Sequence, residues 1–480
     1  MLPVNATLRS QVSRLALEIH ALQTNLAEMQ AELVRLQHQL DAVTYPVLSL
    51  PPEIVSGIFL HCLPAEALGT DGIDNTEAPL LVSHVCSQWR RIALSTPALW
   101  ANLDIDVSCR NLYAAEIAKA WLGRARSSPL SVKIQGQITE LGDSAQFFET
   151  LRRHAPGIKS LEISVYVDDL ARLPQDIDFS LLRDLNIRLI HDDEFPDVFE
   201  AFSGAQALSQ IVLNQMSPSF IALPWQQLQK FTGKSYTIPQ CIEVLSLMPN
   251  LTECAFSVFS LGSLAIPGVF SHSGIRTFTL FRSSSDWGQE ADSAEILEFV
   301  TFPNLESFEL LDVDSKDGEA LDSFFQRYRQ PLKRLIIRPL DATQLVMTSE
   351  PLWQPQLTEL EIWYPETLFA RIFFENLGEQ PDYVSGLQKL TFYCRRDPSE
   401  ERHEELVARA AEAIVSRGKL ESEAQLRVFH AFSIPSNYLA PPPRSALATF
   451  RRLAEEGMDI YIGTEDGRNN YINMKDYTQE

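Results

Sequence analysis

The stretch LKRLII, residues 332–337, decides the fold of most of this 480-residue chain, because the same figure returns many times along the sequence. It has the form L-x-x-L-x-L, and its last two apolar positions alternate as they do in a strand with one buried face. The figure begins at Ile158, Leu182, Leu208, Leu228, Leu251, Ile275, Leu305, Leu332, Leu357 and Leu387, at intervals of 20 to 30 residues. One such strand cannot bury its apolar side alone, so the repetition predicts a stacked α/β repeat.

The segments between these figures contain short helical patterns, such as DSAQFFETLRRH from residue 143 and DGEALDSFFQRYR from residue 317. Two earlier strands, LDIDV from residue 103 and LSVKI from residue 130, are expected to open the array. The array resembles leucine-rich repeats, although it lacks their asparagine position and its units vary in length. We therefore expect a leucine-rich-repeat-like solenoid over residues 103–398. The alternative is a non-repetitive α/β domain whose strands match the figure by coincidence.

The last part of the chain differs from the array in its pattern. Residues 399–417 have helical spacing, LRVFHAF from residue 426 has strand spacing, and a further helix and a final strand follow. A repeat array needs a terminal unit with a polar outer side. Residues 399–480 are accordingly expected to form a C-terminal cap and a tail.

The N-terminal residues 1–44 are expected to form a coiled-coil helix. Apolar residues recur at alternating steps of four and three: Leu8, Val12, Leu15, Ile19, Leu22, Leu26, Met29, Leu33, Leu36, Leu40 and Val43. Val12 and Ile19 fall at a positions and Leu15, Leu22 and Leu36 at d positions, which favours a parallel two-stranded coil and a homodimer through residues 8–43. Packing of the stripe on the chain's own body and an antiparallel pair are the alternatives.

A small helical segment is expected after Tyr45-Pro46, where proline ends the first helix. Pro51 and Pro52 suit the first turn of a new helix with one apolar face. A second helix is predicted over residues 79–96, PLLVSHVCSQWRRIALST. Two short helices make a weak core by themselves, so part of their apolar surface is expected to bind another protein.

The stretches LSLPPEIVSGIF, LLVSHVCSQWRRIA and PALW resemble the F-box, in the variant common among fungal F-box proteins, and place it at residues 45–102. The resemblance implies binding to a Skp-type adaptor, which joins F-box proteins to the cullin and RING subunits of a ubiquitin ligase. The adaptor-binding residues that it implies are Leu50, Pro51, Pro52, Ile54, Ile58, Phe59, Leu81, Val85, Trp89 and Trp100. The loop between Pro64 and Ala78 is longer than in the commoner form. The alternative is that these helices only cap the array.

A second binding surface is predicted on the outward-facing residues of the repeat strands, which alternate with the buried ones. Aromatic and arginine side chains, which are enriched in binding hot spots, gather there. The candidate target-binding residues are Arg188, Phe281, Arg334, Arg338, Trp363 and Tyr393. The alternative is that they are ordinary surface residues.

Composition and motifs argue against catalysis and against nucleic acid. The chain has 63 acidic and 40 basic residues and a formal charge of −23, which opposes a large phosphate-binding face. No glycine-rich phosphate loop, metal-ligand spacing or nucleophile motif was found, so no cofactor, metal or catalytic residue is predicted. The acidic clusters Asp168-Asp169 and Asp192-Asp193-Glu194 are interpreted as solubilising loop residues.

The six cysteines show no CxxC pair and are expected to be free thiols in a reducing compartment. No signal peptide or membrane span is recognised, so an intracellular protein of the cytoplasm or nucleus is expected. Two functions remain. The first is the non-catalytic substrate receptor of a Skp–cullin–F-box ubiquitin ligase, and the second is an interaction scaffold unrelated to ubiquitin.

Overall fold

The computed structural model divides the chain into two compact units, which are described separately. The helical unit comprises Met1–Thr70 and Asp74–Trp100, and the sheet unit comprises Asp71–Ile73 and Ala101–Glu480. The structure describes residues 2–41, 46–64, 73–107, 113–141, 143–190, 198–259, 268–281, 293–313, 318–327, 332–339, 356–365, 367–394, 400–418, 425–433, 443–464 and 470–473. The carboxylate cluster at residues 192–194 and Cys109 lie outside these ranges.

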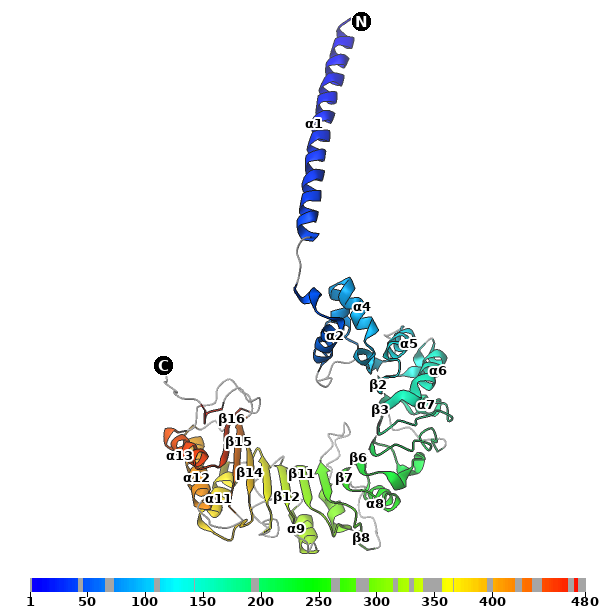
Figure 1. Ribbon diagram of the computed structural model, residues 1–480. Coiled ribbons are helices and arrows are strands. Elements are labelled where there is room, and N and C mark those ends of the chain that lie inside the picture. Colours follow the sequence, from blue (N-terminus) through cyan, green and yellow to red (C-terminus); the bar gives the residue numbers. More distant parts are fainter. Residues whose placement is uncertain are drawn as a thin grey trace. The chain divides into compact units, whose positions relative to one another are not determined.

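Among its described residues, the helical unit contains one long α-helix and three short ones. They are α1 (Leu2–Asp41), α2 (Pro52–His61), α3 (Leu80–Val85) and α4 (Ser87–Ser95). Figure 1 labels α1, α2 and α4. A 3₁₀ turn at Pro97–Trp100 follows α4. The long N-terminal helix expected from the heptads and the helix expected after the double proline are therefore both present.

The second helix predicted for the helical unit, over residues 79–96, is wrong in one respect, because it is two helices. Cys86 has φ −156° and ψ 170°, an extended conformation that separates α3 from α4. Its sulfur accepts a hydrogen bond from the Trp89 amide at 3.5 Å and so caps α4. The side chains of α3 and α4 therefore do not share one continuous helix face, and Leu81 and Val85 of α3 are exposed.

The sheet unit is built on one large parallel sheet. Among the described residues it has fourteen strands, and their order in space is their order in sequence. The strands are β1 (Asn102–Asp106), β2 (Leu130–Gln135), β3 (Ile158–Val165), β4 (Asp184–Leu189), β5 (Gln210–Asn214), β6 (Lys230–Tyr236), β7 (Glu253–Val258), β9 (Thr277–Phe281), β11 (Ser307–Val313), β12 (Arg334–Pro339), β13 (Glu359–Trp363), β14 (Lys389–Cys394), β15 (Val428–Ser433) and β16 (Asp459–Thr464). Every L-x-x-L-x-L figure contributes a strand, which confirms the α/β class and its repetition. A second, two-stranded parallel sheet of β8 (Phe270–Ser271) and β10 (Val300–Thr301) was not predicted.

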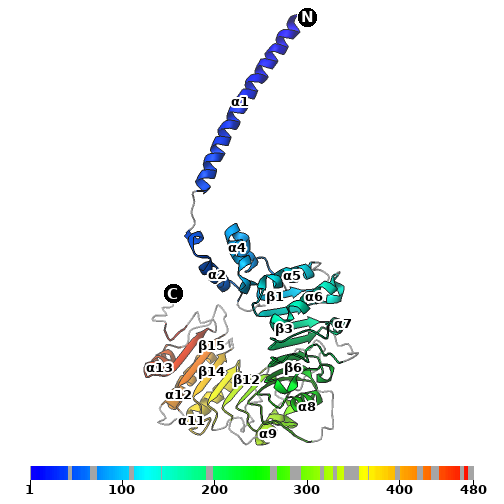
Figure 2. The same cartoon turned by 45° about the vertical axis from the view of Figure 1, so that its right-hand side comes forward.

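The helices of the sheet unit lie along one face of the large sheet (Figures 1 and 2). They are α5 (Ala114–Ala125), α6 (Ser144–His154), α7 (Val167–Ala171), α8 (Ile238–Leu247), α9 (Gly318–Arg327), α11 (Thr367–Glu379), α12 (Glu400–Gly418) and α13 (Arg444–Glu455). Within the described ranges, no helix covers the opposite face. We call that opposite side the open face.

The core lies between the sheet and these helices, where alternate strand residues are buried. Aromatic rings form a continuous line through its centre, with ring centroids 5.7 Å apart for Phe231 and Phe256 and 5.9 Å apart for Phe278 and Phe308. Gly233 lies against this line, and a Cβ atom there would come within 2.9 Å of the Phe231 and Phe256 rings. The missing side chain of Gly233 therefore makes room for the rings.

The segment expected to be a C-terminal cap extends the same sheet, since β15 pairs with β14 and β16 pairs with β15, both in parallel. Its helix α12 packs on α11 at a close approach, where a Cβ on Gly378 would lie 3.3 Å from Ala413. The buried Arg417 of α12 donates hydrogen bonds to the carbonyls of Leu377 (2.7 Å), Gln380 (2.8 Å), Pro381 (3.0 Å) and Tyr383. Leu377 lies in the last turn of α11, and the other three residues follow its end. Arg417 of one repeat therefore satisfies carbonyls at the C-terminal end of the helix in the preceding repeat.

Asp169 corrects the interpretation of Asp168-Asp169 as solubilising loop residues. It is fully buried in α7, and its carboxylate accepts hydrogen bonds from the amides of Ile138 (3.1 Å) and Thr139 (2.7 Å). A carboxylate that satisfies two backbone donors in the core joins two distant segments of the chain. Asp168 beside it is exposed.

No helix within the described part of the chain is long and apolar enough to cross a membrane. The five described cysteines, Cys62, Cys86, Cys241, Cys254 and Cys394, are free thiols.

The carbonyl contacts of Arg417 lead to a stability prediction. Arg417→Met should lower the free energy of unfolding by about 3 kcal/mol, because it removes charged hydrogen bonds to four buried or half-buried carbonyls. Urea unfolding measures the loss. The matched control is Arg409→Met on the same helix, whose exposed ion pairs with Glu405 and Glu375 should contribute less than about 0.5 kcal/mol. Equal losses in the two variants would contradict the role given to Arg417.

Candidate binding surfaces

The short helices of the helical unit enclose a small aromatic core. Phe59 and Trp100 are each 1% exposed, and the Phe59 ring lies 5.0 Å from the Trp89 ring. The Trp100 indole N–H donates to the carbonyl of Ala93 at 2.9 Å. α2, α4 and the turn at Pro97–Trp100 are thereby held together by a few large side chains.

Apolar side chains of these helices also point outward. Ile54 and Ile58 of α2 are 53% and 44% exposed, and Leu81 and Val85 of α3 are 48% and 57% exposed. Each pair has i, i+4 spacing, so its members lie on one side of their own helix. Two pairs of exposed branched or aliphatic side chains within one small unit are typical of a protein-binding surface.

The ten predicted adaptor-binding residues therefore divide into three groups, which are buried, exposed and half-buried. Phe59 and Trp100, which the motif assigned to the interface, are core side chains that are inaccessible to a partner, because the small unit has few other large residues to bury. The exposed members are Pro51, Pro52, Ile54, Ile58, Leu81 and Val85, and Leu50 and Trp89 are half-buried. Leu60 and Leu94, at 38% and 39% exposure, are further accessible apolar residues that the motif did not indicate.

The second candidate surface is the open face of the sheet, where a ladder of stacked rings crosses the last four strands. Trp363 of β13 and Tyr393 of β14 stack at 3.6 Å between centroids, with ring planes 13° apart. Phe432 of β15 continues the stack 5.0 Å from Tyr393, and Tyr461 of β16 lies 5.0 Å from Phe432. The guanidinium carbon of Arg338 lies 5.8 Å from the Trp363 ring, within cation–π range. We call these four rings the aromatic ladder.

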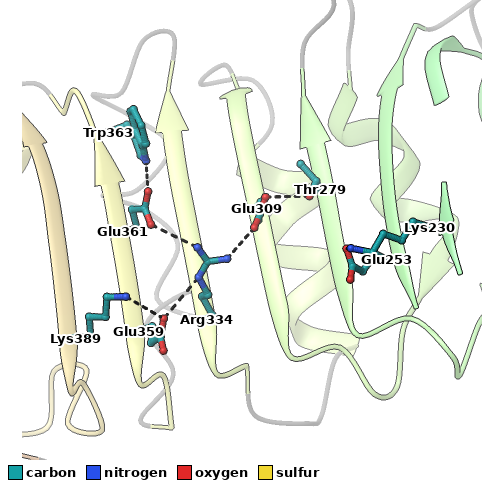
Figure 3. Close-up of polar contacts among 9 residues, drawn as sticks. All are labelled: Lys230, Glu253, Thr279, Glu309, Arg334, Glu359, Glu361, Trp363 and Lys389. Carbon is teal, nitrogen blue, oxygen red and sulfur yellow. Dashed lines mark hydrogen bonds and ion pairs between the residues drawn. The ribbon is translucent and has the colours of Figure 1, made fainter. Parts of the chain in front are cut away.

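A network of ion pairs lies beside the aromatic ladder (Figure 3). The Arg334 guanidinium is 3.0 Å from Glu309, 3.7 Å from Glu359 and 3.6 Å from Glu361. Glu361 also accepts a hydrogen bond from the Trp363 indole N–H at 2.6 Å. Thus the ions hold Trp363 in position, and Arg334 is committed to contacts within the sheet.

All six predicted target-binding residues lie on the open face, but they do not all lie close to one another. Arg334, Arg338, Trp363 and Tyr393 lie on the adjacent strands β12, β13 and β14. Phe281 is two strands from β12, and Arg188 on β4 is six strands from it. At about 4.8 Å per strand, Arg188 is roughly 29 Å away and belongs to a different part of the face.

Phe432 and Tyr461 belong to the ladder but were not among the predicted residues. Their strands were recognised in LRVFHAF and in the final strand, and Phe432 is in register with Tyr393. If the alternation of outward-facing residues had been followed into these two strands, it would have identified both rings. They were missed because residues 399–480 were interpreted as a cap.

The middle of the open face is lined by small side chains in place of rings. A shallow depression of about 230 Å³ lies over β5, β6, β7 and β9, bordered by Thr232, Ala255 and Thr279. The Lys230–Glu253 ion pair, at 2.8 Å, lies at its edge. The face is therefore hollowed in its middle strands and aromatic in its last ones.

The described residues offer little for covalent chemistry. No group of three His, Cys, Asp or Glu side chains in the described ranges could hold a metal ion. Burial raises the pKa of the Cys394 thiol, next to Tyr393, to about 12, and raises the pKa values of Cys241 and Cys254 well above the ordinary thiol range. These thiols are protonated at neutral pH and are poor nucleophiles.

Comparisons with known proteins add little to this geometry. No protein-family model matches the chain, and no curated protein matches it. Among solved structures, a Bacteroides fragilis protein determined by the Northeast Structural Genomics Consortium is similar to this chain with 14% identity and a TM-score of 0.26. The match covers 64% of this chain and 66% of that protein, and a score this low carries no argument about function.

The Arg334 network leads to a second prediction. Arg334→Met should lower the free energy of unfolding by about 1 kcal/mol at low salt, because it leaves three carboxylates without their shared cation. Salt screens this repulsion, so the loss should shrink in about 1 M salt, which urea unfolding at both salt concentrations measures. The control is Arg188→Met, which should change little, since no described residue forms an ion pair with Arg188. A loss independent of salt would contradict the electrostatic explanation.

The edge of the same face leads to a pH prediction. Hydrogen bonds from Lys333 (2.9 Å) and from Arg276 lower the pKa of Glu306. A lowered carboxyl pKa stabilises the folded state above the ordinary carboxyl range, and the effect is lost as pH falls through the lowered value. Glu306→Gln should therefore be less stable than the native chain at neutral pH and equally stable in strong acid. Urea midpoints of the native chain and of Glu306→Gln at several pH values test this, and a difference between the two that persists in strong acid would contradict the role of the charge.

Proposed function

We propose that this protein is the substrate-recognition subunit of a Skp–cullin–F-box ubiquitin ligase. In this proposal the helical unit is an F-box that binds a Skp-type adaptor. The sheet unit is a leucine-rich-repeat-like array that binds the target protein. Ubiquitin transfer itself would be catalysed by other subunits, which act on a target held nearby.

The observation that carries the proposal is the division of side chains in the helical unit. Phe59 and Trp100 form its core, while Ile54 and Ile58 remain in water on the helix that begins with the LPPE motif. Helices that served only the internal packing of this unit would not need two exposed apolar pairs, Ile54 and Ile58 on α2 and Leu81 and Val85 on α3. The ordered motif string and the exposed side chains therefore support the same partner.

The open face supports the second half of the proposal. Its aromatic ladder ends in Arg338, and Trp, Tyr and Arg are the residue types enriched at the centres of protein interfaces. The hydrogen bond from Trp363 to Glu361, which is itself paired with Arg334, orients one ring of the ladder before any partner binds, and such preorganisation lowers the entropic cost of binding. A target protein would accordingly contact β12–β16.

The experiment is a binding measurement between the full chain and a purified Skp-type adaptor. The double variant Ile54→Asp, Ile58→Asp should weaken binding by about 30-fold or more, because two hot-spot residues contribute about 2 kcal/mol or more. The matched control is Leu181→Asp, Leu368→Asp, which changes two exposed apolar residues of the sheet unit and should bind as the native chain does.

Absence of adaptor binding by the intact chain would overturn the ligase proposal and leave the interaction scaffold. Equal binding by the native chain and the Ile54→Asp, Ile58→Asp variant would show that the adaptor uses another surface. Circular dichroism of each variant confirms that its fold is unchanged.

A further inference from the structure

Helix α1 carries an apolar stripe that has no role in the proposed binding of the adaptor or of the target. Its stripe residues from Leu8 to Leu36 are exposed, among them Val12 at 66%, Leu22 at 63% and Met29 at 65%. Within the helical unit, no other described residue covers them. A 40-residue helix with an uncovered apolar seam needs a partner helix.

We propose that α1 binds α1 of a second copy of this chain, as a parallel, in-register, two-stranded coiled coil. Val12 and Ile19 occupy a positions, and Leu15 and Leu22 occupy d positions. β-branched residues at a with leucine at d favour two parallel strands. The stripe keeps its 3.5-residue period from Leu8 to Leu36 within the exposed part of α1, so the seam is continuous over four heptads.

The flanking positions decide between the two orientations. In a parallel pair, g residues meet e residues of the next heptad in the partner, which joins Glu18 to Gln23 and Glu32 to Gln37. These pairs are polar and free of like charges. In an antiparallel pair with the same seam, g residues meet g residues, and Glu18 of each copy faces Glu32 of the other.

Two Glu–Glu pairs beside an apolar seam oppose the antiparallel pair. Glu32 is bound within its own helix by Arg35, at 2.7 and 2.5 Å, which reduces this repulsion without giving Glu18 a cation. The parallel pair needs no such compensation. The charges at the flanking positions and the apolar residues of the seam therefore both favour the parallel orientation.

Orientation decides what the dimer does for binding. α1 has 40 residues and is about 60 Å long, at 1.5 Å per residue. In a parallel coil the two copies of Pro46 follow the same end, separated from α1 by only residues 42–45, whereas an antiparallel coil sets them about 60 Å apart. The parallel dimer thus presents two copies of every following surface at a high effective concentration to one multivalent target.

The first test uses the full chain in solution without any adaptor, so it is independent of the proposed ligase function. Light scattering should give about twice the 54.1 kDa of one chain. Leu15→Glu at a d position should raise the dimer dissociation constant at least tenfold. Leu17→Glu is the matched control, because Leu17 is two residues away, 72% exposed and off the seam at position f, and it should leave the dimer unchanged.

A monomeric native chain would overturn the proposal, as would a dimer that Leu15→Glu leaves intact. If Leu17→Glu dissociates the dimer as strongly as Leu15→Glu, helix formation, not the seam, is responsible, and the proposed seam is wrong. Thermal unfolding of both variants checks that the sheet unit remains folded.

The second test measures orientation by disulfide formation. A single Leu15→Cys change should cross-link two parallel copies under oxidation, with the native chain as the background for its own cysteines. An antiparallel seam places Leu15 opposite Leu33 of the other copy, so cross-linking only in the Leu15→Cys, Leu33→Cys double variant would overturn the parallel arrangement. Failure of both to cross-link would overturn the seam itself.

Discussion

Hydrogen bonding between consecutive strands is the constraint on which the sheet unit depends. Each interior strand of the large sheet pairs in parallel with the strand of that sheet that comes before it along the chain and with the one that comes after it. Parallel neighbours need a connection that returns to the same end, and these connections carry the helices. Because the helices lie on one face, the other face stays open, and in-register pairing aligns side chains such as Trp363 and Tyr393 into rows across it. The aromatic ladder is thus a result of the pairing as much as of the residues in it.

Much of this arrangement could be predicted from the sequence, because short-range apolar spacing produces it. The fourteen strands follow directly from alternation, and the first leucine of each figure is buried, as at Leu182 and Leu357. Three features could not be predicted in this way. The break at Cys86 depends on one backbone conformation inside an otherwise helical pattern, and the role of Asp169 depends on amides 30 residues away. The β8–β10 pair has only two residues in each strand, too few to show a period.

For the binding surfaces, too, sequence periodicity predicts only part of what the structure shows. Periodicity indicates which side of a strand or helix is polar or exposed, but not which exposed residues are already engaged. Arg334 resembled a free hot-spot cation in the sequence, whereas in the structure it neutralises three carboxylates of neighbouring strands. Phe59 similarly belongs to an apolar helix face that the motif gives to a partner, yet in the structure it is buried inside the unit, where its ring packs against Trp89. Whether a side chain is buried depends on how all the elements of its unit pack together, which the local sequence pattern does not specify.

The agreement between spatial and sequence order also has a mechanical consequence. A force applied to the two ends of the sheet unit would act first on an edge strand, which is held by one neighbour, while each interior strand is held by two. Detaching that strand with its helix creates a new edge of the same kind, so resistance would be met again one unit, about 25 residues, further along the chain. Such a protein yields under tension in successive steps and reassembles from whichever units remain, unlike a sandwich or barrel that must break as a whole.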